Sequence, residues 1–339
     1  MPRIFVSRTI PEAGLAMLRD EAELDIFPHG DDASPSVETI LAGVRQADVL
    51  LSHLTEKIDE AVMTANPKLR GIANYAVGFN NIDIPTATRL GLPIGNTPGI
   101  LTDTTADLAW TLILSTARRV VEADKFMRGG DYKLWGPSTM LGYDISPGGS
   151  GRRKVLGLIG FGAIGRAVAK RAVGFDMDIL AYDPFASQDT EGLPVTFVEL
   201  PDLLKQSDVV SIHTPLNEDT HHLIGTEELA MMKSDALLIN SARGPIIDEA
   251  ALVTALRERK IAGAGLDVYE DEPVMSPGLA ELGNAILLPH IGSATIDTRN
   301  QMATRAAGNA LAFLKGERAP FTVNPEVYDT AAYKKRLGK

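Results

Sequence analysis

Short apolar runs alternate with amphipathic stretches along most of the chain. In the first hundred residues, strands are expected at residues 3–7, 23–27, 47–54, 69–76 and 92–96. Helices are expected between them, at residues 11–21, 36–46, 58–65 and 83–90. Such alternation is typical of βαβ units and predicts a parallel sheet.

The alternation stops near residue 100 and resumes at residue 154. Residues 102–130 carry one long helical pattern that ends at two glycines, and an irregular stretch follows it up to residue 153. Further strands are expected at residues 154–160, 178–183, 209–213, 236–241, 262–268 and 285–290. The chain is helical again from Ala294, and residues 331–339 are expected to form a solvated tail. The pattern predicts two α/β blocks, as a chain of 339 residues would have at about 150 residues per domain.

Composition changes this picture mainly by exclusion. Hydrophobic residues make up 45% and charged residues 23% of the chain, which is typical of a globular protein. The net charge of −11 disfavours nucleic acids and anionic membranes as partners. Since the chain has no cysteine, disulfides, thiolate nucleophiles and Cys-based zinc sites are excluded, and no metal site is predicted. No signal peptide or transmembrane helix is expected. We therefore expect a cytoplasmic location.

The stretch "VLGLIGFGAIG" joins an apolar strand to an amphipathic helix through Gly160, Gly162 and Gly165. A GxGxxG pattern in this strand–helix context is typical of a dinucleotide-binding loop. We expect the first glycine to permit the turn, the second to let the backbone approach a pyrophosphate, and the third to let the helix pack closely. The first helical residues, Ala163, Ile164 and Gly165, would direct N–H groups at the phosphates.

The strand after this helix ends at Asp183, 18 residues beyond Gly165. An acidic side chain at that point accepts hydrogen bonds from the ribose hydroxyls of NAD and repels the 2′-phosphate of NADP. No Arg or Lys occurs in the next 21 residues to offset the charge. We therefore predict that NAD(H) is preferred over NADP(H).

Polar residues follow the carboxyl ends of the later strands. They are His213, Thr214 and Pro215, then Ser241, Ala242 and Arg243, then Asp267 with the acidic run 270–272, and finally His290 with Gly292. Ligands of doubly wound sheets bind beyond the carboxyl ends of the strands. We therefore expect these residues to line the crevice that holds the dinucleotide.

These side chains suit hydride transfer to a 2-keto acid. Arg243 would hold the substrate carboxylate and polarise its carbonyl, because a guanidinium is always charged and binds in a fork. His290 would protonate the forming alkoxide, and a hydrogen-bonded carboxylate would favour its charged form. On the residues alone, other roles stay open: a surface position for Arg243, a solvated acidic loop, and a structural role for Asp267 or His290.

Six segments resemble the D-2-hydroxyacid dehydrogenase family, and specifically its glyoxylate/hydroxypyruvate reductase branch. They are "NYAVGFNNIDI", "NTPGILTDTTADLAWTLIL", "LGLIGFGAIG", "LLINSARGPIIDEAALVTAL", "AGAGLDVYEDEP" and "LPHIGSA". The resemblance implies that Arg243, Glu272 and His290 are catalytic, with Glu272 supporting His290. It also implies that Asp267 and Thr105 lie near the nicotinamide.

The resemblance further implies that backbone N–H groups of Ala76, Val77 and Gly78 bind the substrate carboxylate, and we expect residues 52–54 to shape the pocket. It predicts a flavodoxin-like substrate-binding domain built from residues 1–100 and 294–339. A Rossmann NAD-binding domain would span residues 101–293, with a cleft between the two. Members of the family are usually homodimers, in which a residue like Trp135 closes the partner's site. Residues 146–153 are longer than the usual connection, and their role stays open.

Several functions remain open at this point. The first is NADH-dependent reduction of glyoxylate or hydroxypyruvate, and the second is dehydrogenation of another D-2-hydroxyacid. The third is a corepressor-like binding protein that senses NAD on the same fold. Turnover of a keto acid would separate the two enzymes from the binding protein.

Overall fold

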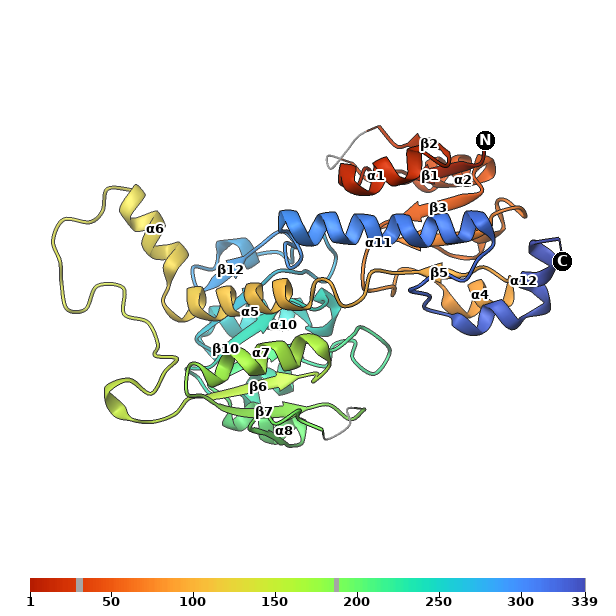
Figure 1. Cartoon of the computed structure of the whole chain (residues 1–339). Helices are drawn as coiled ribbons and strands as arrows, with labels where there is room; N and C mark the ends of the chain where they lie inside the picture. Colours follow the sequence, from red (N-terminus) through yellow and green to blue (C-terminus); the bar gives the residue numbers. More distant parts are fainter. Residues whose placement is uncertain (29–32, 186–188, 339) are drawn as a thin grey trace. The chain divides into compact units, whose positions relative to one another are not determined.

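The structure is a computed structural model that describes residues 1–28, 33–185 and 189–338, so Lys339 of the expected tail lies outside it. The chain forms two compact units (Figure 1). The first unit consists of residues 1–101 and 294–339, and the second of residues 102–293.

The first unit is built on a five-stranded sheet in which every strand pair is parallel. Its strands are β1 (Arg3–Val6), β2 (Glu23–Ile26), β3 (Val49–Ser52), β4 (Gly71–Asn74) and β5 (Ile94–Gly95). Its helices are α1 (Glu12–Arg19), α2 (Val37–Gln46), α3 (Glu60–Thr64), α4 (Ile84–Arg89), α11 (Ile296–Lys315) and α12 (Ala331–Arg336), with a 3-10 turn at Pro325–Asp329. The strand order β2-β1-β3-β4-β5 is flavodoxin-like, as predicted.

Helix α11 joins the C-terminal segment to this sheet. It packs beside α1 and against β3 and β4 (Figure 1). Gly71 in β4 makes this possible, because a Cβ at that position would lie 2.5 Å from the ring of Phe313. The first unit therefore depends on a residue pair more than 200 positions apart in sequence, as a discontinuous fold requires.

The prediction of a solvated tail after residue 330 is wrong for the described part of that segment. Residues 331–336 form α12, which is capped by the hydroxyl of Thr330. Tyr333 is buried, and the guanidinium of Arg336 donates to the carbonyl oxygens of Leu69 and Leu90 at 2.8 and 2.9 Å. One aromatic anchor and one multidentate Arg thus tie a short basic segment to the unit.

The second unit is built on a seven-stranded sheet, again with every pair parallel. Its strands are β6 (Val155–Ile159), β7 (Asp178–Tyr182), β8 (Val195–Phe197), β9 (Val209–Ile212), β10 (Leu237–Asn240), β11 (Gly263–Leu266) and β12 (Ala285–Leu287). The order β12-β11-β10-β9-β6-β7-β8 is the Rossmann order with one added strand. The fold class is therefore confirmed for both sheets, although the three-residue β8 was not predicted.

Most helices of the second unit cover this sheet, whereas residues 120–128 extend away from it (Figure 1). They are α5 (Thr102–Ala117), α6 (Val120–Arg128), α7 (Ala163–Val173), α8 (Leu200–Gln206), α9 (Thr226–Met231) and α10 (Glu249–Arg257), with 3-10 turns at Gly148–Ser150, Gly244–Ile246 and Leu279–Glu281. Helix α5 packs against α7 and against β10 and β11. No helix among the described residues is long and apolar enough to cross a membrane.

The single long helix predicted over residues 102–130 is wrong, because the chain breaks between α5 and α6. Arg119 takes the left-handed conformation there, with φ of 54°. The backbone N–H of Tyr143 donates to the carbonyl of Ala117 at 2.8 Å, and a Cβ on Gly142 would lie 2.2 Å from the same oxygen. A later segment therefore crosses the end of α5 and takes the place of the next helical turn.

Candidate active site

The polar residues predicted for the crevice follow the carboxyl ends of six strands in the second unit. The glycine loop follows β6, Asp183 follows β7, residues 213–215 follow β9, residues 241–243 follow β10, Asp267 and Glu272 follow β11, and His290 and Gly292 follow β12. In a parallel sheet these ends lie along one edge. Strands β6 and β9 are neighbours there, and the order of the sheet reverses at that pair.

The glycine loop is shaped by close backbone contacts. Gly160 has φ of 95°, and a Cβ there would lie 2.6 Å from the backbone nitrogen of Thr214. A Cβ on Gly165 would lie 2.3 Å from the carbonyl oxygen of Gly160. A Cβ on Gly162, in contrast, would meet no described atom within 4 Å. The first and third glycines thus serve packing, whereas the second faces open space.

The start of α7 offers donors for an anion. Gly162 is its N-cap and provides no side-chain cap, so the first-turn N–H groups lack an intrahelical partner. The buried hydroxyl of Ser241, after β10, also finds no partner among the described residues. These features fit a nicotinamide dinucleotide, whose pyrophosphate needs donors and whose close approach needs the open space at Gly162.

Asp183 lies beside the glycine loop. Its Oδ2 accepts a hydrogen bond from the backbone N–H of Phe161 at 2.8 Å, and its Oδ1 accepts one from Phe185 at 3.0 Å. These two backbone N–H groups hold the carboxylate next to the glycine loop. The guanidinium of Arg166 stacks over the Phe161 ring at 4.6 Å and donates to the carbonyl of Asp189.

His213 follows β9 as a partly buried, uncharged group. Its Nε2 lies 2.9 Å from the hydroxyl of Ser211, two residues earlier on the same face of the strand. Burial lowers the pKa of His213 to about 4. At neutral pH the side chain is therefore an uncharged imidazole, and its Cβ lies 3.8 Å from the position that a Cβ on Gly165 would take.

Arg243 follows β10 on a segment clamped by Asn240. The buried Asn240 side chain donates to the Arg243 carbonyl at 2.9 Å and accepts from the Ala242 N–H at 3.0 Å. The guanidinium donates to the Ala242 carbonyl at 2.7 Å. Burial lowers the pKa of Arg243, and the negative charge of Glu272 opposes that effect. The charge of Glu272 is therefore close enough to Arg243 to influence its pKa.

Glu272 and His290 form a direct pair. The Oε1 atom of Glu272 lies 2.8 Å from Nδ1 of His290, and both side chains remain partly accessible, at 30% and 23%. His290 has φ of 54°, which is uncommon for a residue other than glycine. The carboxylate therefore fixes an imidazole whose backbone is already held in an unusual conformation.

Asp267 holds the backbone on which His290 lies. Its Oδ1 accepts from the Ile291 N–H at 2.7 Å, and its Oδ2 accepts from the Gly292 N–H at 2.8 Å. Its pKa is raised, chiefly because the carboxyl is buried, while these bonds and the charge of His290 act in the opposite direction. Thr105 on α5 is buried next to this segment, 3.6 Å from an added Gly292 Cβ. Asp267 thus positions His290 from the end of the neighbouring strand.

Two further residues brace this edge, and the sequence did not single them out for this role. One is Asn240, described above, and the other is Tyr269, whose hydroxyl donates to the Leu288 carbonyl at 2.9 Å. Burial raises the pKa of Tyr269 to about 12. The only sequence signal was a polar residue at the end of an apolar strand, which is too common to identify a brace.

In the first unit, the predicted carboxylate loop follows β4. Its three carbonyl oxygens are all taken, since Ala76 accepts from the Thr97 N–H and the side chains of Asn96 and Asn74 donate to Val77 and Gly78, each at 2.9 Å. For the N–H groups of residues 76–78, no acceptor is found within residues 1–28, 33–185 and 189–338. The loop therefore directs its acceptors inward and leaves donors for an anion.

A buried polar cluster lies at the ends of β1 and β3, in the same unit. The Ser7 hydroxyl donates to Oε2 of Glu56 at 2.9 Å and lies 3.2 Å from Nδ1 of His53. Burial, with the nearby charges of Arg8 and Arg299, lowers the pKa of His53 to about 3. At neutral pH the imidazole is therefore uncharged, and its second ring nitrogen is Nε2. This Nε2 is buried without a partner among the described residues.

Known proteins resemble the chain over nearly its whole length. The family described as D-isomer specific 2-hydroxyacid dehydrogenase, NAD binding domain, matches residues 110–292, more than half of the chain. The glyoxylate reductase of Korarchaeum cryptofilum is 49% identical over 329 residues, covering 96% of this chain and 97% of that protein. A crystal structure of a protein from Thermus thermophilus superposes with a TM-score of 0.87 at 40% identity, covering 95% and 99% of the two chains. An NADPH-dependent glyoxylate/hydroxypyruvate reductase of Sinorhizobium meliloti, solved with NADP and malonate, has a TM-score of 0.80 at 30% identity, with 96% and 97% covered.

Proposed function

Because the chain belongs to the D-isomer specific 2-hydroxyacid dehydrogenase family and is an NAD(P)-dependent oxidoreductase, we propose that it reduces a small 2-keto acid, glyoxylate or hydroxypyruvate, to the 2-hydroxy acid. The observation that carries this proposal is the contact between Glu272 and His290, in which the charge of Glu272 also acts on the half-buried Arg243. A histidine held by a carboxylate is a suitable proton donor for a forming alkoxide.

Each of these three side chains has a separate task in the proposal. Arg243 holds the substrate and polarises its carbonyl through a charge that is permanent at neutral pH. His290 donates a proton from Nε2, since its Nδ1 faces Glu272. The nicotinamide cofactor, when bound, supplies the hydride. Asp267 acts as a positioning residue, because both of its oxygens accept from the backbone next to His290.

The first unit is proposed as the substrate-binding domain and the second as the cofactor-binding domain. The N–H groups of Ala76, Val77 and Gly78 would bind the substrate carboxylate, which suits a loop whose carbonyls are all engaged elsewhere. The buried Nε2 atom of His53 would form a hydrogen bond with a hydroxyl group, which can both donate and accept. Hydroxypyruvate carries such a hydroxyl next to its carbonyl, so this nitrogen favours it among the small keto acids.

NAD(H) is the proposed cofactor, with Asp183 as the selecting residue. Its carboxylate is fixed by two backbone N–H groups beside the glycine loop, where a 2′-phosphate would meet its charge. The guanidinium of Arg166 lies over the Phe161 ring of this loop, but it already donates to Asp189 and lies 3.7 Å from Glu191. Because its positive charge is balanced by Glu191, Arg166 would contribute little to binding a 2′-phosphate.

A homodimer is the proposed assembly. Helix α6 buries none of its residues within the chain, and the segment after it exposes Leu134 by 83%, Trp135 by 72% and Leu141 by 64%. Large exposed apolar side chains in one stretch are typical of an interface. Residues 120–141, which we call the arm, would form the contact with a second copy, with Trp135 near the partner's active site.

The proposal is tested by NADH oxidation with glyoxylate, hydroxypyruvate, pyruvate and longer 2-keto acids, with NADPH in parallel. Pyruvate is the matched control for hydroxypyruvate, because the two differ by one hydroxyl. We expect turnover of glyoxylate and hydroxypyruvate, with hydroxypyruvate preferred over pyruvate by about tenfold or more in kcat/KM. Failure of every keto acid would refute the proposed reaction, whereas equal rates for the matched pair would refute only the role of His53.

A further inference from the structure

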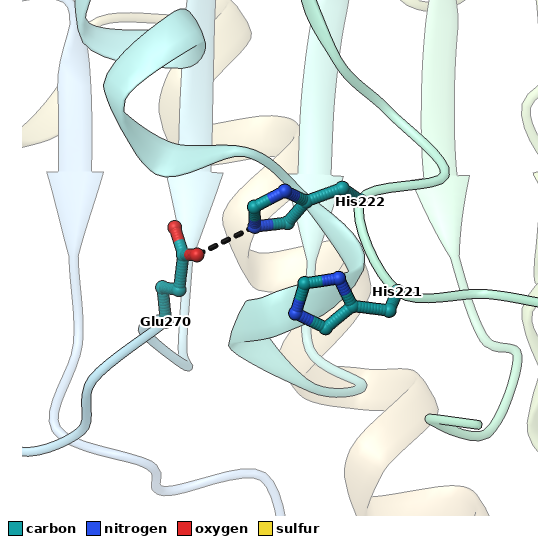
Figure 2. Close-up of side chains that lie close together, drawn as sticks. All are labelled: His221, His222 and Glu270. Carbon is teal, nitrogen blue, oxygen red and sulfur yellow. Dashed lines mark hydrogen bonds and ion pairs between the residues drawn. The ribbon is translucent and has the colours of Figure 1, made fainter. Parts of the chain in front are cut away.

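Three side chains that are ligands of transition metals lie together in the second unit, outside the residues used for catalysis (Figure 2). They are His221, His222 and Glu270. One ligand atom from each lies within 4.8 Å of the other two. The two histidines come from the connection between β9 and α9, and the glutamate comes from the segment after β11.

The backbone at His222 directs two consecutive imidazoles to the same side. Side chains of neighbouring residues in an extended chain point in opposite directions. His222 has φ of 51°, and its ring stacks on that of His221 with centroids 4.1 Å apart at an angle of 28°. Figure 2 shows both rings on the side of Glu270. The positive φ of His222, which is uncommon for a residue with a side chain, thus places the two imidazoles next to each other on one side of the chain.

Glu270 is held in place by a second carboxylate. Its Oε1 lies 2.5 Å from Nε2 of His222, and its Oε2 accepts from the N–H of Glu249 at 3.1 Å. The buried Glu249 carboxylate in turn accepts from the Glu270 N–H at 2.8 Å and from the Ser276 N–H at 2.6 Å. Ligands of metal sites are usually oriented by outer hydrogen bonds of this kind.

We propose that His221, His222 and Glu270 bind a divalent cation of borderline hardness, with Zn²⁺ as the best match. Two imidazoles and one carboxylate form the His₂Glu set that binds zinc with a fourth position open to water. Ligand atoms in a tetrahedral zinc site lie about 3.3 Å apart, given bonds of about 2.0–2.1 Å. The His222–Glu270 pair must open slightly and the widest pair must close, which the exposed side chains of both histidines permit.

The proposed ion joins two segments that lead to the active site. One runs from His213 to His222, and the other from Asp267 to Glu272. A cation between them would tie these segments together and stabilise the folded second unit, in proportion to its binding. The site supplies no group to hydride transfer, so this proposal does not depend on the proposed reaction.

The test is zinc binding by the metal-free full-length protein, measured by competition with a chromogenic chelator. We expect one Zn²⁺ per chain, and we expect His222→Ala and Glu270→Gln each to weaken binding by about tenfold or more. His290→Gln is the matched control, because it removes the other histidine that lies against a glutamate. It should leave zinc affinity unchanged. The proposal is overturned if zinc does not bind, or if His222→Ala and Glu270→Gln bind it as the wild type does.

Zinc X-ray absorption identifies the ligands independently of affinity. The spectrum of the loaded protein should contain two imidazoles per zinc, and one in the His221→Ala variant. An unchanged spectrum in that variant would contradict the assignment. Each variant is compared with its own metal-free form, because the substitutions also remove hydrogen bonds of the metal-free site. Zinc should raise the thermal midpoint of the wild type more than that of the His221→Ala and Glu270→Gln proteins. An equal rise in the His221→Ala and Glu270→Gln proteins would place the ion elsewhere.

Discussion

Glu272 Oε1 lies 2.8 Å from Nδ1 of His290, although the two residues are 18 positions apart and follow different strands. A carboxylate only accepts hydrogen bonds, so Nδ1 is the donor to it and Nε2 is the atom left for the substrate. The contact therefore determines which nitrogen carries the exchangeable proton. It also places a negative charge where an imidazolium gains stability.

Removal of that charge should change the pH dependence of the reaction. In Glu272→Gln the histidine loses the group that stabilises its protonated form, so we expect the optimum for keto-acid reduction to move to more acidic pH. The measurement is kcat/KM against pH for wild type and variant. Glu281→Gln, which makes the same change on a 3-10 turn of the second unit, is the control. If the Glu272→Gln profile stays in place, the pair does not set the protonation state of His290.

Cofactor choice should follow the charge at Asp183. Asp183→Asn keeps an oxygen for the Phe161 N–H but removes the negative charge, so we expect the preference for NADH over NADPH to fall by about tenfold or more. Asp178→Asn makes the same change at the other end of β7 and should leave the preference unaltered. The ratio of kcat/KM for the two cofactors is the readout. A wild type that prefers NADPH would show that Asp183 does not select the cofactor.

Acid should destabilise the second unit through His213. Its folded pKa is lowered from 6.5 to about 4, so between these values the unfolded chain binds a proton that the folded protein excludes. The stability from the neutral imidazole is present above pH 6.5 and is lost as the pH falls toward 4, by a few kcal/mol at most. In His213→Gln the fall of the thermal midpoint over this window should be shallower than in the wild type. An equally steep fall would assign the acid sensitivity to other groups.

The exposed arm should control assembly. Light scattering after size exclusion should give twice the chain mass of 36.3 kDa for the wild type. Leu134→Glu combined with Trp135→Glu should shift the mass toward one chain, because burying two carboxylates in an apolar interface is unfavourable. Val37→Glu, at an exposed apolar position of the first unit, is the control and should remain dimeric. A monomeric wild type, or a variant that stays dimeric, would contradict the proposed interface.

The fold could be predicted because its dominant signal is local. Buried parallel strands read as short apolar runs, and the amphipathic helices between them complete the alternation. Three features of the fold could not be predicted from the sequence. The break at Arg119 arises from Gly142 and Tyr143 crossing the end of α5, β8 has only three residues, and α12 depends on Tyr333 and Arg336 meeting distant backbone.

Some residues of the candidate site could likewise be predicted from the sequence, and others could not. Residues at strand ends, such as Arg243 and His290, could be chosen because parallel topology brings those ends to one edge. His53 was expected to shape the pocket, but its contacts with Ser7 and Glu56 could not be predicted, because the members of the cluster are up to 49 positions apart and their contact depends on sheet order. The His221–His222–Glu270 group could not be predicted either. It depends on a positive φ at His222, and the pattern of apolar and polar residues does not show backbone angles.

The central claim is that His290 donates the proton in keto-acid reduction. Its most direct test is steady-state NADH oxidation by His290→Gln, with NADH affinity measured separately by fluorescence titration. We predict that kcat falls by about two orders of magnitude or more while NADH still binds, as expected when a general acid is lost. A kcat near that of the wild type would contradict the account, because the proton would then come from another group.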